Sequence, residues 1–478
     1  MPPSFEFLPM SYMLQRKSHP TAITLAGPPS RPLPGIVLAL WVALFSQSGC
    51  APTEGKDTAF HPLTTTNQDF LAPEFTPVGN NPIALAYTSL SGVLDKVAVS
   101  IFLENRITVL QNTSGTLTEI ASLNTLAYPA KLVMADLDGS GMASPDIAVL
   151  NGKALAISVY LNAGAGWDQA ITLTLTDPAA EFQAAQVVGS ALPDLVVAQP
   201  GKHQVTLFRN EGAGVFTPME LNSDPGAADP NTVVTTPSRI VVRDFNADGI
   251  PDLALLLLST NQVGVLQGNS LTPDTFSVPA NTPYPVGVLP KQVLSGNLNG
   301  DALVNDLAVF NATDMTFTPL WDAWNAIPGG PIAFTPGTPS STTAIPGMAL
   351  LAELDKSTPA SALEIALVRE GDNFVTVFRN DGAGNFTPVH IKVNSGPFDV
   401  IVGDWNVDSN LDLAVAERGT RSISLLAGDG AGNFTSTVLG LESLPTYPTR
   451  VDANGDGKDD LLLLQPLNDS LVLFLHVP

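Results

Sequence analysis

The chain repeats one arrangement of polar and hydrophobic positions eight times. In each copy an acidic residue is followed at once by a short aliphatic run, as in DLALL at Asp252 and DLLLL at Asp460. Such runs are typical of buried strands, and repeats of about 40–50 residues are typical of propeller blades. The eight copies begin at Asp95, Asp146, Asp194, Asp252, Asp306, Glu364, Asp412 and Asp460.

A second element occurs in register with the first. VTLFRNEGAGVFTP over Val205–Pro218 and VTVFRNDGAGNFTP over Val375–Pro388 are nearly identical, with looser copies over Ser158–Gln169 and Ser424–Ser436. Each copy contains an alternating strand, a Gly-rich turn and a second strand, which is the pattern of a β-hairpin.

One complete unit predicts four strands, over 238–245, 252–258, 263–268 and 275–278. A single four-stranded sheet cannot bury both of its faces, so such units are expected to pack around an axis. The last unit is one strand short, and Asp57–Phe70 could supply that strand and close the ring. We therefore predict an all-β propeller over residues 57–478 with eight four-stranded blades, and seven blades as the alternative.

Acidic loops precede several of the aliphatic runs. In the loop Asp244, Asn246, Asp248 and Asp252, the side chains at positions one, three and five converge on one point. Gly249 at position six turns the chain, so that a backbone carbonyl and the last carboxylate can complete a shell of oxygen ligands. Hard oxygen ligands in this number suit calcium (Ca2+) rather than zinc or copper. Asp452, Asn454, Asp456 and Asp460 form a second complete loop.

Three further loops carry partial ligand sets. They contain Asp404, Asn406, Asp408 and Asp412, then Asp136, Asp138, Ser140 and Asp146, then Asn297, Asn299, Asp301 and Asp306. A more distant copy has Glu353, Asp355, Ser357 and Glu364, whereas the units at Asp95 and Asp194 lack the ligands. The alternative to a metal site is an Asx turn, in which Asp and Asn only accept hydrogen bonds from the loop's own amides.

The tandem DxNxDGxxD loops followed by runs such as DLAV resemble the FG-GAP or VCBS repeat family, known from the N-terminal propellers of integrin α chains. The resemblance extends from about Asn80 to the C-terminus. It implies a β-propeller whose usual roles are extracellular adhesion, recognition of protein or carbohydrate, and sometimes support of a catalytic domain. In integrins the ligand binds on the face opposite the calcium loops.

The charge of the chain limits its partners. The formal net charge is −24, and the 21 basic residues form no cluster. A phosphate backbone or an anionic lipid surface would be repelled, so nucleic-acid binding is not expected. Any contact with a membrane is expected through an N-terminal lipid alone.

The N-terminal region resembles a bacterial lipoprotein signal. Basic residues precede an apolar stretch over Gly35–Ser46, and SGC ends at Cys50, the only cysteine. The stretch is too short for a permanent membrane span. We expect residues 1–50 to be a signal peptide, Cys50 to be lipidated, and 51–56 to be a tether, with the protein exported to the outer membrane or cell surface. An ordinary cleaved signal is the alternative.

The sequence contains no HExxH pair and no GxSxG motif. The expected function is therefore non-catalytic binding of an extracellular protein or polysaccharide. The alternatives are a carbohydrate-binding, lectin-like propeller and a polysaccharide lyase or hydrolase. Candidate recognition elements are the connections Asn222–Pro237 and Gly337–Pro346, while Trp321 and Trp324 could stack on a sugar or pack between blades.

Overall fold

The computed structural model describes residues 69–477, apart from 163, 165, 169, 189–190, 223–234, 270–274, 281, 302–304, 324–328 and 357–361. The predicted signal peptide, Cys50 and the tether lie outside the described residues. Within the described part of the chain, no helix is sufficiently long and apolar to span a bilayer.

The described strands form eight antiparallel sheets, which we number as blades in chain order. Blade 1 contains β2 (Pro82–Leu90), β3 (Val93–Ile101), β4 (Arg106–Thr113) and β5 (Thr116–Asn124). Blade 2 contains β6 (Pro129–Ala135), β7 (Asp146–Asn151), β8 (Ala156–Tyr160) and β9 (Ile171–Thr174). Blade 3 contains β10 (Glu181–Ala185), β11 (Asp194–Gln199), β12 (Gln204–Asn210) and β13 (Phe216–Asn222), with a 3₁₀ turn η2 (Pro200–Lys202).

The outer strands of blades 4 and 5 are each divided into two short segments. Blade 4 contains β14 (Pro237–Arg243), β15 (Asp252–Leu257), β16 (Gln262–Gly268), β17 (Phe276–Ser277) and β18 (Tyr284–Pro285). Blade 5 contains β19 (Pro290–Gly296), β20 (Asp306–Asn311), β21 (Thr316–Asp322), β22 (Phe334–Pro336) and β23 (Ser340–Ser341). Part of the predicted connection 337–346 is therefore strand, because β23 pairs with β21.

The remaining blades complete the ring. Blade 6 contains β24 (Ile345–Ala352), β25 (Glu364–Glu370), β26 (Phe374–Asn380) and β27 (Phe386–Lys392). Blade 7 contains β28 (Pro397–Gly403), β29 (Asp412–Glu417), β30 (Ser422–Gly428) and β31 (Phe434–Gly440). Blade 8 contains β32 (Thr446–Val451), β33 (Asp460–Gln465), β34 (Ser470–Phe474) and β1 (Glu74–Pro77), with a 3₁₀ turn η3 (Pro466–Asn468).

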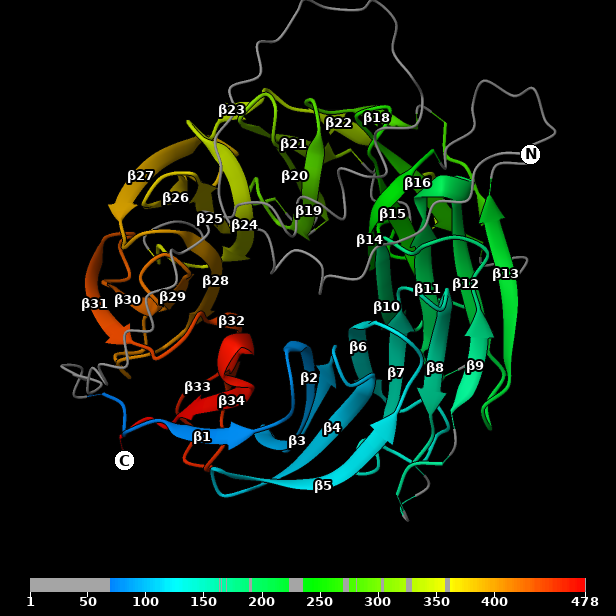
Figure 1. Cartoon of the computed structure of the whole chain (residues 1–478). Helices are drawn as coiled ribbons and strands as arrows, with labels where there is room; N and C mark the ends of the chain where they lie inside the picture. Colours follow the sequence, from blue (N-terminus) through cyan, green and yellow to red (C-terminus); the bar gives the residue numbers. More distant parts are fainter. Residues whose placement is uncertain are drawn as a thin grey trace, which may run out of the picture. The chain divides into compact units, whose positions relative to one another are not determined.

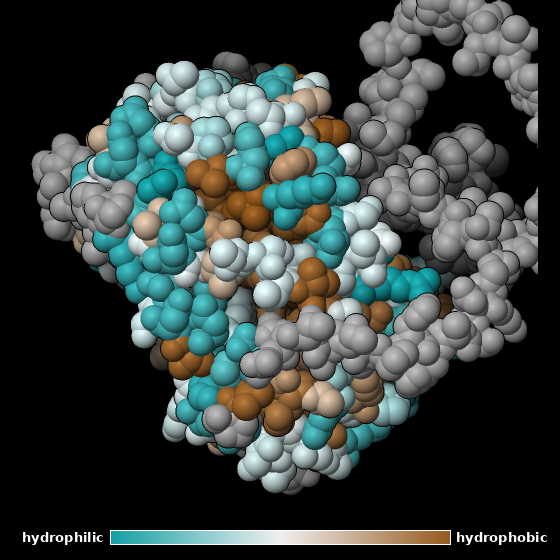
Figure 2. Space-filling model, turned by 90° about the vertical axis from the view of Figure 1, so that its left-hand side faces the viewer, coloured by the Kyte–Doolittle hydropathy of each residue, from teal (hydrophilic) through white to brown (hydrophobic). Residues whose placement is uncertain are grey.

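The prediction of an all-β propeller with eight blades is confirmed, and the seven-bladed alternative is wrong. Figure 1 shows the first strand of each blade, such as β2, β14 and β28, nearest the axis. The last strands, such as β5, β13 and β31, lie at the periphery. Figure 2 views the molecule from the left-hand side of Figure 1, where hydrophilic and hydrophobic residues are interspersed.

The ring closes differently from the sequence-based prediction. The fourth strand of blade 8 is β1, which pairs antiparallel with β34 from Glu74↔Leu473 to Pro77↔Ser470. Of the predicted segment, Phe70 forms only an isolated bridge with His476. Residues 57–68 lie outside the described part of the chain. The closing strand is the short EFTP segment, which shows too little alternation to be recognised in a sequence.

The second strand of each blade explains the repeated aliphatic runs. In β7, β15 and β33 every residue is buried, because both faces of the strand contact a neighbouring blade. Hydrophobic clusters lie between successive blades, as where Leu207 of blade 3 and Leu255 of blade 4 share one cluster. The core is thus divided among the blade interfaces, as expected for a repeat protein.

Candidate metal centres in the acidic loops

All the acidic loops lie on one face of the propeller. Each connects the first and second strands of its blade, and the Gly-rich turns that connect third and fourth strands lie on the same face. The opposite face carries the turns between second and third strands and the connections between blades. We call these faces the loop face and the connection face.

The last acid of each loop, which we call the closing acid, is fixed by backbone amides. In blade 4, Oδ2 of Asp252 accepts a 2.8 Å hydrogen bond from the amide of Phe245, and Oδ1 accepts one of 2.8 Å from Gly268. The side chain therefore joins the loop to the end of the third strand. Equivalent bonds to the end of the third strand, or to the second residue after it, occur at Asp146, Asp194, Asp306, Asp412 and Asp460.

Burial disfavours the charged form of these closing acids. Together with a smaller repulsion from the loop carboxylates of Asp248 and Asp244, burial raises the pKa of Asp252 to about 7. Burial likewise raises the pKa of Asp146, Asp306 and Asp412 to about 6 and that of Asp460 above its ordinary value. A bound cation at the loop would favour the ionised form of these groups.

The complete loop of blade 4 is ordered by Asx-type hydrogen bonds. Oδ2 of Asp244 accepts from the amide of Gly249 at 2.8 Å, and Oδ1 of Asp248 accepts from Ile250 at 2.8 Å. Gly249 has φ +81°, a conformation that glycine adopts without strain. Asn246 is fully buried and donates to the carbonyl of Gly330 at 3.2 Å. These contacts order the loop, but the carboxylates of Asp244, Asp248 and Asp252 do not all lie within 4.8 Å of one another.

The loops of blades 7 and 8 repeat this network. Oδ2 of Asp404 accepts from Ser409 at 2.9 Å, and Oδ2 of Asp452 accepts from Gly457 at 3.0 Å. Ser409 has φ +69°, so it adopts the left-handed conformation of the glycine that it replaces. The Asn406 and Asn454 amides each donate to an oxygen of the acid two residues on, Asp408 and Asp456.

The carboxylates approach one another most closely in an incomplete loop. In blade 2, oxygens of Asp136, Asp138 and Asp146 all lie within 4.8 Å of one another. Among the described residues, these three acids are the set that is close enough to hold a metal ion. Ser140 lies in the same loop and donates through its hydroxyl to the carbonyl of Asn162 at 3.2 Å. The sequence favoured the complete loops instead, because their ligand spacing matched the motif.

The loop of blade 5 and the distant copy of blade 6 differ from the others. Asn297 donates to the carbonyl of Asp301 at 2.8 Å, and Asn299 donates to its carboxylate at 2.9 Å. In blade 6 the buried carboxylate of Asp355 pairs with Arg379, Nη2 to Oδ2 2.5 Å. An arginine thus neutralises the acid at that position, while Ser357 lies outside the described residues.

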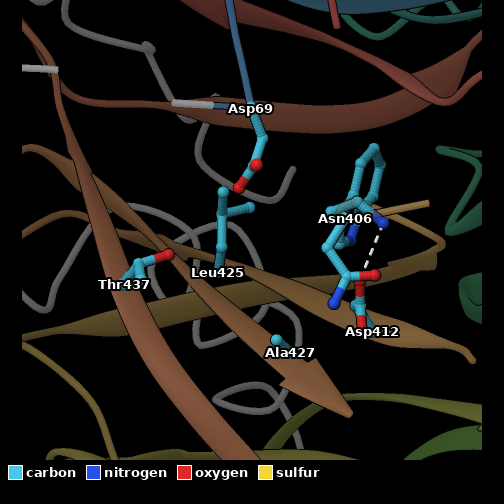
Figure 3. Close-up of a pocket in the computed structure, with 7 residues that line it drawn as sticks. Asp69, Asn406, Asp412, Leu425, Ala427 and Thr437 are labelled. Atoms are coloured by element: carbon cyan, nitrogen blue, oxygen red, sulfur yellow. Dashed lines mark hydrogen bonds between the residues drawn. The ribbon is translucent and has the colours of Figure 1, made fainter. Parts of the chain in front are cut away.

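A small pocket adjoins the acidic loop of blade 7 (Figure 3). Asn406 and Asp412 of that loop line it together with Asp69, which belongs to the segment that precedes β1. Asp412 accepts a 2.8 Å hydrogen bond from the amide of Trp405, whose buried indole N–H has no protein acceptor. The segment before β1 also packs on this loop, since the ring centroids of Phe70 and Trp405 are 6.5 Å apart, which the sequence did not indicate.

One feature was not recognised from the sequence. The closing acid of blade 3, Asp194, holds its loop although that loop lacks the other ligands. The sequence did contain a signal for this role, because the closing acid and the residue whose amide it binds are sixteen positions apart in blades 2, 3 and 4. Trp321 packs with the core cluster around Phe378, and Trp324 lies outside the described residues.

The comparisons with known proteins agree with this architecture. Residues 189–255 and 404–463 match the family model of the FG-GAP-like repeat. The protein is therefore an eight-bladed β-propeller that carries FG-GAP-like repeats. None of the curated proteins compared with the chain matches it.

Several solved structures are similar in fold. The Dos1 propeller is 11% identical with a TM-score of 0.55, covering 84% of this chain and 95% of that one. The dihydro-heme d1 dehydrogenase NirN is 10% identical with a TM-score of 0.53, covering 82% and 74%. A putative 6-phosphogluconolactonase from Bacteroides fragilis is 16% identical with a TM-score of 0.45, covering 80% and 97%. At these identities the likeness concerns the fold alone.

Proposed function

We propose that the chain is an exported, lipid-anchored β-propeller that is stabilised by calcium and binds a protein or polysaccharide at the cell surface without catalysis. The observation that carries the calcium part is the convergence of Asp136, Asp138 and Asp146 within 4.8 Å. Three carboxylates at that separation repel one another unless a proton or a cation intervenes. Loops with oxygen side chains at the same positions recur on this face, and calcium accepts six to eight such ligands.

The localisation part of the proposal depends on the sequence. The apolar stretch Gly35–Ser46 and the SGC ending at Cys50 favour export and lipidation. A Cys50→Ser variant is expected to lose incorporation of radiolabelled palmitate and to leave the membrane fraction. Equal labelling and equal membrane association of the variant would contradict the anchor.

The binding part depends on the rigid ring and its two distinct faces. Proteins with a rigid scaffold commonly bind through the loops that it presents. The loop face is occupied by the proposed metal sites, so we assign macromolecular binding to the connection face. The packing of the partly buried Trp321 against the core cluster around Phe378 weakens the lectin alternative, because part of the ring is then covered by protein. The lyase or hydrolase remains the alternative from another functional class.

The calcium proposal is tested on purified full-length protein. Elemental analysis is expected to find calcium, and addition of a chelator is expected to lower the melting temperature. The double variant Asp452→Asn, Asp456→Asn should reduce the calcium-induced rise in melting temperature. Asp381→Asn is the matched control, because Asp381 is an acid of a Gly-rich turn outside these loops. Absence of bound metal together with an unchanged melt would exclude the proposal.

The binding proposal is tested separately with glycan and protein arrays. Full-length protein is applied in calcium and again in chelator after its fold has been verified by circular dichroism. Binding of polysaccharides would identify a carbohydrate partner and would lead to an assay of turnover. Binding of surface proteins would favour adhesion, and a blank result on both arrays would contradict recognition of either class.

A further inference from the structure

An asparagine at the start of the Gly-rich turns is buried in three blades. Asn210 and Asn380, in the segments FRNEGAG and FRNDGAG, end the third strands β12 and β26, and Asn112 lies near the end of β4. At most 8% of the surface of each is exposed. Their side-chain oxygens accept hydrogen bonds from the turn amides of Gly212, Gly382 and Gly115 at 3.0, 3.1 and 3.0 Å. The two N–H donors of each carboxamide remain for other partners.

These donors connect the asparagine to the acidic loop of the preceding blade. Nδ2 of Asn210 donates to the carbonyl of Leu137 in blade 2 at 2.8 Å and to that of Pro193 in blade 3 at 2.9 Å. The same two contacts join Asn112 to Ala453 and Leu94, at 2.7 and 2.7 Å, and Asn380 to Leu298 and Leu363, at 2.8 and 3.1 Å. Each side chain therefore bridges two blades, and we call these three residues the clasp asparagines.

The residue that accepts the clasp occupies the same place in each loop. Leu137 lies between the candidate ligands Asp136 and Asp138, is fully buried, and donates through its amide to Oδ2 of Asp146 at 2.6 Å. Its own blade thus fixes its amide, and Asn210 of the next blade fixes its carbonyl. Ala453 and Leu298 are held in the same way, through 2.7 and 2.8 Å hydrogen bonds to Asp460 and Asp306.

The clasps occur where the preceding loop carries oxygen ligands. The loops of blades 8, 2 and 5 contain ligand sets, and the clasps come from blades 1, 3 and 6, which follow them around the ring. The loops of blades 1 and 3 lack the ligands, and in blade 6 an arginine pairs with the acid. After blades 3 and 6, the equivalent positions are Gly268 and Gly428, which have no side chain to form a clasp.

The other junctions have different contacts or no acidic loop. Asn305 of blade 5 donates to the carbonyl of Asp244 in blade 4 at 3.1 Å, and the amide of Asp404 in blade 7 donates to Asp459 in blade 8 at 2.7 Å. The remaining copy, Asn162, follows blade 1, in which a tight turn between β2 and β3 replaces the acidic loop. The clasp is therefore associated with the ligand sets and is not a general feature of the repeat.

A clasp restricts the two ligand side chains beside the residue that it holds. Oxygens of Asp136 and Asp138 both lie within 4.8 Å of one another and of Asp146. Because Leu137 joins the first two of these acids, a rotation of its peptide groups would move a carboxylate away from the others. Hydrogen bonds from outside the ligand shell orient metal ligands, and their loss commonly lowers metal affinity by about 10- to 100-fold.

We propose that the clasp asparagines are positioning residues for cation binding in the loops of blades 8, 2 and 5, and that they couple each loop to its junction with the next blade. The inference rests on the proposed binding of calcium and adds its regulation. By linkage, a cation that orders the loop stabilises the junction, and an intact junction raises the cation affinity by the same factor. Blades 1, 3 and 6 thus contribute to cation sites that their own loops do not contain.

A double-mutant cycle on the full-length protein tests the clasp between blades 2 and 3. Asp138→Asn removes a ligand, Asn210→Ala removes the clasp, and calcium affinity is measured by calorimetry. Asn210→Ala is expected to weaken one calcium site about tenfold or more. In the Asp138→Asn background it should leave calcium binding unchanged. Its effect on the melting temperature in chelator, which reflects the lost hydrogen bonds, should be equal in both backgrounds.

Asn112→Ala is the matched control, because it breaks the same clasp on the loop of blade 8. Its effect on calcium binding should persist in the Asp138→Asn background. If Asn210→Ala does not fold, a cycle of Asn112→Ala with Asp456→Asn tests the inference at the junction of blades 8 and 1.

The outcomes separate this inference from the calcium proposal. Wild-type calcium affinity in the clasp variant, or an equal loss of affinity with and without Asp138→Asn, overturns the inference and leaves the calcium proposal intact. Absence of calcium binding by the wild-type protein refutes the calcium proposal, and the inference with it.

Discussion

The closing acids have two proposed roles, holding their loops by hydrogen bonds and binding a metal ion. The closing acid of blade 3, Asp194, allows the first role to be measured without the second. Asp194 is fully buried, and its Oδ2 accepts from the amides of Val187 at 3.1 Å and Val188 at 2.8 Å. Its Oδ1 accepts from the amide of Asn210 at 2.8 Å. The loop of this blade lacks the other ligands, so a substitution at Asp194 changes no predicted metal site.

Asp194→Ala leaves three amides without that acceptor. A buried donor without a partner costs about 1–3 kcal/mol, and the three losses are not fully additive. We expect the free energy of unfolding to fall by about 3–5 kcal/mol, at the upper end of single substitutions. Asp194→Asn retains one oxygen acceptor, and its effect should therefore be intermediate.

Urea unfolding measured in chelator and in calcium provides the assay. The loss caused by Asp194→Ala should be equal in both conditions, because the hydrogen bonds involve no metal. Asp456→Ala in blade 8 is the counterpart, with a small effect in chelator and a loss of the calcium-induced stabilisation. If Asp194→Ala unfolds at the wild-type urea concentration, or if calcium restores its stability, the role assigned to the closing acids is refuted.

Three further predictions follow from the same contacts. In chelator, the melting temperature should fall as the pH rises from about 5 to about 8. The reason is that Asp252 has a pKa of about 7 in the folded state and 3.8 in the unfolded state, so the folded protein binds this proton more tightly. A melting temperature that rises over this range would contradict the assigned burial. Deletion of residues 69–77, which removes β1, should lower the melting temperature because β34 loses its partner strand; equal melts would show that β1 does not close the ring. Gly300→Ala should lower the melting temperature more than Gly371→Ala. Both glycines have a positive φ, but only the Cβ added at Gly300 would lie 2.5 Å from the carbonyl oxygen of Gly382.

The repeats allowed much of the fold to be predicted from local patterns. The aliphatic runs after Asp146, Asp252 and Asp460 correspond to fully buried second strands. The Gly-rich segments correspond to the turns between third and fourth strands, where Gly382 and Gly384 have positive φ. Both features depend on residues that are close in the sequence, which is why the eight repeats could be counted without a structure.

Contacts between distant residues could not be predicted in this way. In the distant copy of the acidic loop in blade 6, Asp355 forms an ion pair with Arg379. No sequence spacing encodes that arrangement.

The sequence by itself indicated eight repeats, the face on which the acids lie and the residue types that could hold a cation. Only the tertiary structure decided which strand closes the ring and which acids approach within 4.8 Å of one another. The physical reason is one of range. Strand and turn formation depend on hydrophobic periodicity and backbone conformation over a few residues, whereas the pairing of charges depends on the packing of whole blades around an axis.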